Sequence, residues 1–240
     1  MKKISAFTFI IFMFLAVIGT QTHEWGHIAI ARYLGYKTQL HYASMHPYNP
    51  RHLKPYSEEL INRKSEISAE TDTMKKALMR EDLNKFVSSF VKKNRFKELL
   101  IVTGGPIQTM LTGTLGLILL LFRRKFWSTG VLKWLDWLGV FLSFFWLRQI
   151  FNLIIHFAKK LLRMSDSIIL SDEIKIAKYM NWHPSSLSII TGIIALLIAV
   201  FVVFKVVPRG IRFSFVTGGI LGGLSGFYLW FYILGPVLLP

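Results

Sequence analysis

The apolar residues of this chain are gathered into five long runs, and no other feature of the sequence constrains the fold as much. A helix needs about 20 consecutive, predominantly apolar residues to cross the hydrocarbon core of a bilayer. The runs cover about residues 4–33, 99–122, 132–157, 187–207 and 213–239. Hydrophobic residues make up 52% of the 240 residues, more than a water-soluble domain of this length needs. We therefore expect an all-α polytopic membrane protein, a single membrane-embedded domain over residues 1–240 built as a bundle of about five transmembrane helices.

A polar insertion at residues 36–98 separates the first run from the second. Apolar and polar residues alternate from Tyr36 to Tyr42, which predicts a short strand. From about Thr73 to Val91 the apolar residues recur at helical spacing with lysines and arginines between them, which predicts an amphipathic helix. Such a helix either lies at the headgroup boundary or caps the bundle in water, and both alternatives stay open. The insertion is expected to be small and of mixed structure.

The fifth run is rich in glycine, at positions 218, 219, 222, 223 and 226. Small residues at such spacing allow two helix backbones to approach each other closely. This run is therefore expected to pack against a neighbouring span.

The chain is strongly basic, with a formal net charge of +16. In membrane proteins lysine and arginine gather in the loops that meet anionic headgroups, and the sequence has no basic motif interleaved with aromatic residues. We expect the lipid bilayer as a partner and no nucleic acid, in a multi-pass protein of the cell membrane of a bacterium. Lys2 and Lys3 before an apolar run also resemble a signal peptide, but no A-x-A-like cleavage site follows.

The residues His-Glu-Trp-Gly-His at positions 23–27 stand at the end of the first run. Two histidines four residues apart share one face of a helix, so their imidazoles can converge on one metal ion. The intervening Glu24 can take a proton from a zinc-activated water. Without a metal, the two histidines would instead hydrogen-bond to neighbouring residues, and Glu24 would form a salt bridge with Arg32. Ionisable residues inside a span are costly, however, and are usually functional. The motif predicts a hydrolytic zinc site at the membrane, with Glu24 as general base.

The third zinc ligand must be a histidine or a carboxylate, because the chain has no cysteine. With five spans, the segments that follow the first and the third span lie on the same side of the membrane. The candidate ligands on that side are His41, His46, His52, Asp166, Asp172, Glu173 and His183. The residues alone leave the choice among them open.

Three stretches of the chain resemble the site-2 protease family of intramembrane zinc metalloproteases. Residues 23–27 are similar to the family's H-E-x-x-H, Gly104-Gly105-Pro106 resembles its glycine-proline element, and Ser171-Asp172-Glu173 is similar in position to its aspartate motif. Carried over by position, the resemblance implies a Zn²⁺ site with the ligands His23, His27 and Asp172 and the general base Glu24. The second and third stretches also suit the start of a helix, where proline and acidic residues are favoured.

The chain departs from the family pattern at Thr109, at Glu173 and after Asn152, where the family's proline is missing, and these differences indicate a divergent branch. Thr109 stands where the family has an asparagine after the glycine-proline element, and Glu173 replaces the glycine after the aspartate. Asn152, in the third run, resembles the family's asparagine that precedes the aspartate motif. Arg148 lies one turn before it, and we expect both side chains to support the site or to hydrogen-bond within the bundle.

We expect this chain to be an intramembrane zinc metalloprotease, an endopeptidase that hydrolyses peptide bonds of membrane-spanning or membrane-adjacent polypeptides. The stretch from Tyr36 to Tyr42 could hold such a substrate extended by edge pairing. One alternative is a membrane-bound zinc peptidase of another lineage that cuts soluble peptides, with Glu173 as the third ligand. The other is a non-catalytic membrane relative in which the motif is structural.

Overall fold

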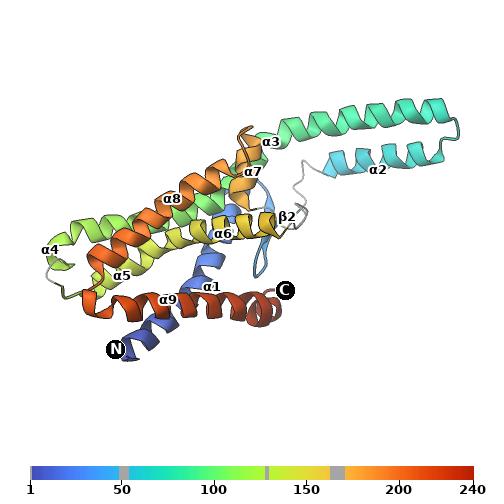
Figure 1. Cartoon of the computed structure of the whole chain (residues 1–240). Coiled ribbons are helices and arrows are strands. Elements are labelled where there is room, and N and C mark those ends of the chain that lie inside the picture. Colours follow the sequence, from blue (N-terminus) through green and yellow to red (C-terminus); the bar gives the residue numbers. More distant parts are fainter. Residues whose placement is uncertain (1, 49–53, 128–129, 163–170) are drawn as a thin grey trace.

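The computed structural model describes residues 2–48, 54–127, 130–162 and 171–240, and most of them are helical (Figure 1). The longer elements are α1 (Lys2–Tyr33), β1 (Lys37–Leu40), β2 (Met45–Tyr48), α2 (Lys54–Ala69), α3 (Thr73–Phe122), α5 (Trp134–Ser143), α6 (Leu147–Leu161), α7 (Asp172–Tyr179), α8 (Ser186–Phe201) and α9 (Arg212–Tyr228). Short helical segments complete the described chain: α4 (Arg124–Trp127), η1 (Phe144–Trp146), η2 (Val202–Val206), η3 (Arg209–Ile211), η4 (Leu229–Leu234) and α10 (Gly235–Leu238).

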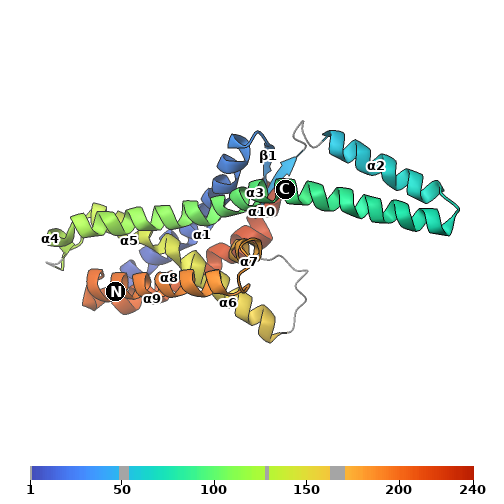
Figure 2. The same ribbon diagram turned by 90° about the horizontal axis from the view of Figure 1, so that it is seen from above.

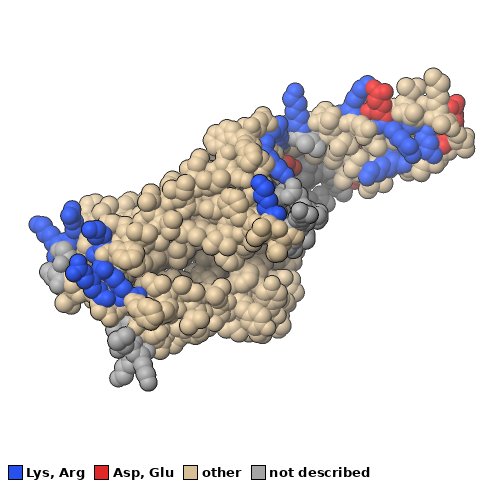
Figure 3. Space-filling model, in the orientation of Figure 1, with Lys and Arg blue, Asp and Glu red and all other residues tan. Residues whose placement is uncertain are grey.

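Within the described residues, five helical stretches are long and apolar enough to cross a membrane. They are Ser5–Tyr33, Lys92–Phe122, Trp134–Leu161, Ser186–Val206 and Arg209–Leu238, which confirms the five predicted helices. Their outer faces carry exposed leucines such as Leu115 and Leu197. Figure 3 shows an uncharged band across the bundle, with lysines and arginines gathered beyond both of its ends. These features are compatible with an integral membrane protein.

The centre of the bundle is a cluster of phenylalanines contributed by α1, α5, η1 and α9. The ring of Phe12 lies 5.9 Å from that of Phe141, 5.3 Å from that of Phe144 and 5.7 Å from that of Phe215, measured between centroids. Such tilted and edge-on pairs are the favoured aromatic geometry. The cluster joins the first, third and fifth spans.

The glycines of α9 allow it to lie directly against α1. A Cβ atom on Gly218 would come within 2.7 Å of the carbonyl oxygen of Ser5, and one on Gly222 would overlap the carbonyl group of Phe9. Gly226, one turn further on, meets the backbone of α1 in the same way. The expectation that the glycine-rich span packs against a neighbour is confirmed, and the neighbour is the span that carries the histidine motif.

The polar insertion forms a hairpin and an arm that projects from the bundle (Figures 1 and 2). The predicted strand is present as β1, which pairs with β2 in an antiparallel hairpin. The predicted helix over residues 73–91 is the outer part of α3, whose first turn is capped by the Asp72 side chain. Tyr56 of α2 stacks on Phe86 and Phe90 of α3 and joins the two helices of the arm.

Candidate metal centre

The structure brings His23, His27 and Asp172 together at the junction of α1 and α7. The Nε2 atoms of His23 and His27 lie 2.9 and 3.2 Å from the Oδ2 atom of Asp172. One potential ligand atom from each residue lies within 4.8 Å of the other two. On a tetrahedral zinc ion, with bonds of about 2.0–2.2 Å, neighbouring ligand atoms lie roughly 3.4 Å apart, so the three groups need only small movements to hold such an ion.

Both imidazole rings are oriented by hydrogen bonds from their other nitrogen to α3. His27 Nδ1 lies 2.7 Å from the carbonyl oxygen of Ile101 and 3.3 Å from the backbone nitrogen of Gly105, and both of these residues belong to α3. His23 Nδ1 lies 2.9 Å from Thr109 Oγ1, whose own hydroxyl donates to the carbonyl of Gly105 at 3.0 Å. The Nε2 atoms of both histidines therefore face Asp172, and support of the second ring nitrogen is how metal-binding histidines are commonly held.

Glycines at the crossing of α1 and α3 make this close approach possible. Gly26 and Gly104 face each other so tightly that a Cβ atom on either would overlap the carbonyl group of the other. A Cβ atom on Gly105 would come within 2.5 Å of His23 Nε2. Gly104 and Gly105 therefore shape the metal centre, and since Pro106 lies inside α3, the interpretation of this stretch as a helix start is wrong.

Short contacts of α7 with α3 and α6 place the third residue of the centre. The Tyr179 hydroxyl donates to Glu98 at 2.5 Å, and Arg95 donates to the Tyr179 carbonyl at 2.7 Å. Burial, together with the hydrogen bond to Glu98, raises the pKa of Tyr179 to about 12. On the other side of α7, Asn152 donates to the carboxylate of Glu173 at 3.1 Å. These contacts fix both ends of α7, and with it the position of Asp172 at the histidines.

The Asp172 carboxyl is prepared to act as an anionic ligand. Burial alone would raise its pKa, but the hydrogen bonds with His23 and His27 outweigh burial and hold that pKa well below the usual range of an aspartate. Lys175, one turn further along α7, adds a positive charge 3.6 Å from Asp172 Oδ1. The carboxylate is therefore ionised at neutral pH.

The other candidate ligands that the structure describes have other partners. Glu173 is buried and bound by Asn152. His41 and His46 face each other at the hairpin, with ring centroids 4.8 Å apart, and His183 accepts a hydrogen bond from the Ser185 backbone. Two further candidates, at positions 52 and 166, lie outside the described residues. Of the described candidates, Asp172 is the one that joins the histidines.

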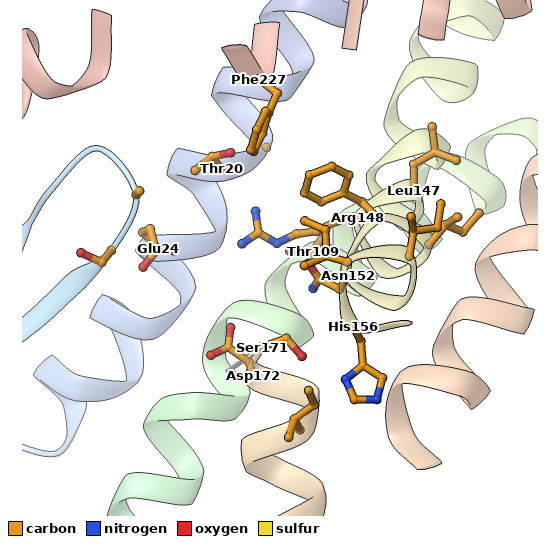
Figure 4. A pocket seen from close by; sticks show the side chains of 18 of the residues that line it. Thr20, Glu24, Thr109, Leu147, Arg148, Asn152, His156, Ser171, Asp172 and Phe227 are labelled. Atoms are coloured by element: carbon orange, nitrogen blue, oxygen red, sulfur yellow. The ribbon is translucent and has the colours of Figure 1, made fainter. Parts of the chain in front are cut away.

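A cavity of about 1490 Å³ opens onto the metal centre from between the spans (Figure 4). Its polar wall includes Glu24, His27, Arg148, Asn152 and Asp172. Phenylalanines of α6, α9 and the helical segments beside them make up much of the remaining wall. A large apolar chamber with a few converging polar groups is the usual form of a ligand site.

The donor set of the centre suits a metal ion, so the three residues could hold one. Two neutral imidazoles and one carboxylate, each supported by further hydrogen bonds, are the ligands that catalytic zinc sites use. The supporting carbonyl of Ile101 was not predicted, because a backbone group has no sequence signature. Asn152 is placed as predicted, since it contacts the residue next to Asp172.

No protein-family model matches this chain, and no curated protein or solved structure does so either. The resemblance to the site-2 protease family therefore stays a prediction from three short stretches. The geometry of the metal centre and its cavity has to carry the functional conclusion.

Proposed function

We propose that this chain is an intramembrane zinc metalloprotease, with the ligands His23, His27 and Asp172 and the general base Glu24. The observation that carries the proposal is the arrangement of the two histidines, whose Nδ1 atoms are bound to α3 while their Nε2 atoms face one carboxylate oxygen. Its location in the cell membrane of a bacterium stays a prediction.

The chemistry proposed is hydrolysis of a peptide bond. Zn²⁺ held by the three residues would supply Lewis acidity and make water a better nucleophile near neutral pH. Glu24 follows His23 on α1, is only 6% exposed, and lines the cavity. In this proposal its carboxylate accepts a proton from the attacking water and passes that proton to the leaving amine.

The cavity supports a polypeptide of the membrane as the substrate. It lies between spans, and its wall includes Phe144, Phe151 and Phe227, which suit apolar side chains. A helical substrate must unwind near the cut, because its peptide groups are otherwise bonded within the helix. The hairpin contributes Tyr42, at the end of the predicted stretch, and Met45 and Pro47 of β2 to the cavity wall, which supports an extended substrate beside β2 rather than β1.

The alternative with Glu173 as the third ligand has less support. The Glu173 side chain is bound through both of its carboxylate oxygens, at 3.1 and 3.2 Å, to the amide of Asn152. Its role is therefore to fix α7, while the residue before it completes the metal centre. A peptidase built on Glu173 would need α7 to rotate away from this contact.

The proposal is tested by zinc content and peptide cleavage measured on the same detergent-purified samples. The probe is a quenched-fluorescent library of transmembrane peptides. We expect roughly one zinc per wild-type chain, its loss in Asp172→Ala, and its retention in Glu24→Gln with cleavage at least about 100-fold slower, because a general base contributes this much. Glu66→Gln, on the exposed face of α2, is the matched control and should behave as wild type.

Two results would contradict the proposal. The first is a folded wild-type protein that takes up no zinc even when zinc is supplied. The second is cleavage by Glu24→Gln at the wild-type rate, which would show that the motif is not the catalyst.

A further inference from the structure

An arginine inside the third span points into the cavity without a matching carboxylate. Arg148 lies on α6, and its side chain extends toward α1 and the level of Glu24 (Figure 4). Its Nε atom is buried and has no hydrogen-bond partner. In the described part of the chain, no carboxylate forms an ion pair with its guanidinium, although Glu24, Asp172 and Glu173 act on its charge from a longer range.

Arg123, which is partly buried, shows how such a charge is satisfied by a carboxylate. Arg123 Nε donates to Asp136 Oδ1 at 2.6 Å, and Asp136 is completely buried. Arg148 has an acidic neighbour that could do the same, but the carboxylate of Glu173 is bound by Asn152 instead. A guanidinium in a span is costly, and it presents several N–H donors in a fixed plane. The donors of Arg148 are therefore directed at the cavity and its contents.

From this placement we infer that Arg148 is a further catalytic residue, which donates hydrogen bonds to the carbonyl oxygen of the peptide bond being cut. The inference rests on the proposed function. Arg148 and Glu24 line the same cavity from opposite elements, α6 and α1, with Asp172 beside them. In a peptide bond bound between these three residues, the carbonyl oxygen can reach the Arg148 guanidinium and the carbonyl carbon stays accessible to water.

The step balances with the groups present. The oxygen of water forms a bond to the carbonyl carbon, its proton moves to the Glu24 carboxylate, and the carbonyl electron pair moves onto the oxygen that Arg148 binds. The pair then returns, the carbon–nitrogen bond breaks, and Glu24 gives its proton to the leaving amine. The charge on the oxygen exists only between these two events, so a guanidinium aimed at it lowers the barrier more than it strengthens substrate binding.

A phosphinic pseudopeptide tests the inference directly, because its tetrahedral anionic group resembles the species that Arg148 would bind. Its affinity, the zinc content and the cleavage of the peptide library are measured for wild type, Arg148→Gln, Arg148→Lys and Glu24→Gln. Arg124→Gln is the control for the lost charge, since Arg124 is exposed on α4 at the other end of the bundle (Figure 1).

We expect Arg148→Gln to keep its zinc, to bind the phosphinate about 100-fold more weakly, and to lose about 100- to 1000-fold in kcat with little change in KM. Arg148→Lys should retain part of the phosphinate affinity and part of kcat. If Arg148→Gln does not fold, the comparison is made with Arg148→Lys alone. Unchanged phosphinate affinity in both Arg148 variants, no phosphinate binding by wild type, or loss of zinc in Arg148→Lys would overturn the inference.

The outcome separates this inference from the proposed function. If Glu24→Gln is inactive while the Arg148 variants match wild type in cleavage and phosphinate affinity, only the role of Arg148 is wrong. If zinc-loaded wild type cleaves no more than Glu24→Gln, the proposed function is wrong, and the phosphinate titration still decides whether Arg148 binds a tetrahedral anion.

Discussion

Each histidine of the metal centre uses its two ring nitrogens for different tasks. The Nδ1 atoms of His23 and His27 bind α3, at Thr109 and at the carbonyl of Ile101, and the Nε2 atoms face the carboxylate of Asp172. A single helix thus fixes the position and the direction of both rings. This support distinguishes the centre from two histidines that merely share a helix face.

Replacing Thr109 by valine removes the hydrogen-bond partner of His23 Nδ1 while keeping the shape of the side chain. We expect zinc affinity to fall about 10- to 100-fold, because supporting groups of this kind contribute that much. Competition with a chromophoric chelator measures the affinity. Thr114→Val is the matched control, since the Thr114 hydroxyl donates only to a backbone carbonyl of its own helix, at 2.7 Å. Equal affinities in the two variants would show that Thr109 does not orient His23.

The sequence predicted the candidate metal ligands and the general base better than it predicted the groups that hydrogen-bond to the ligands. His23, Glu24 and His27 stand out because their spacing has a meaning on any helix. Thr109 stands out only as a departure from the family pattern, and Ile101 contributes a backbone carbonyl that every residue type has. The partners of a side chain depend on which helices meet, and local spacing does not determine this.

At the scale of elements, helix α3 shows that an apolar run predicts the limits of a membrane span better than it predicts the limits of the helix that contains the span. The sequence predicts the start of the second span near Leu99, where the charged residues end, but α3 continues unbroken from Thr73. Lysine, arginine and glutamate are good helix formers, so a polar stretch does not end a helix. The Asp72 side chain, which accepts from the Met74 amide at 2.8 Å, marks the true start. Helix α2 was not predicted, because its apolar residues lack a clear helical period.

The contact between α1 and α9 can be tested with two adjacent glycines. A methyl group added by Gly222→Ala would overlap the Phe9 carbonyl, whereas one added by Gly223→Ala meets no atom within 4 Å. We expect Gly222→Ala to lower the free energy of unfolding by roughly 1–3 kcal/mol, as overpacking usually does. Gly223→Ala should be neutral or slightly stabilising, because alanine favours the helix. Thermal unfolding in detergent compares them, and equal midpoints would contradict the close packing of α1 and α9.

At the scale of the whole molecule, the arrangement of apolar and charged surface predicts where the bilayer lies. The side chains of Leu115 and Leu197 are 61% and 64% exposed on the sides of the bundle, whereas Arg80 is exposed on the arm. The hydrocarbon core is about 30 Å thick, and α3 has 50 residues, which at about 1.5 Å per residue is more than twice that thickness. We therefore predict that the arm extends into water.

Because the chain contains no cysteine, single introduced cysteines can carry a spin label at chosen positions. In reconstituted vesicles, labels at positions 115 and 197 should be relaxed by oxygen, which concentrates in lipid, and a label at position 80 by a water-soluble nickel complex. Stronger relaxation by nickel at position 115 than at position 80 would contradict this placement of the membrane. The zinc content of each labelled protein is measured as a control for an intact metal centre.

The order of the ligands along the chain sets when the metal centre can exist. His23 and Asp172 are separated by 149 residues, and three of the five spans precede Asp172. Since a chain is synthesised from its N-terminus, the histidines are made long before their carboxylate partner. The centre is thus completed late in biogenesis. If the proposed function holds, such a hydrolase is silent while its chain is being made, and its catalytic competence reports that α7 has met the helix that carries the histidines.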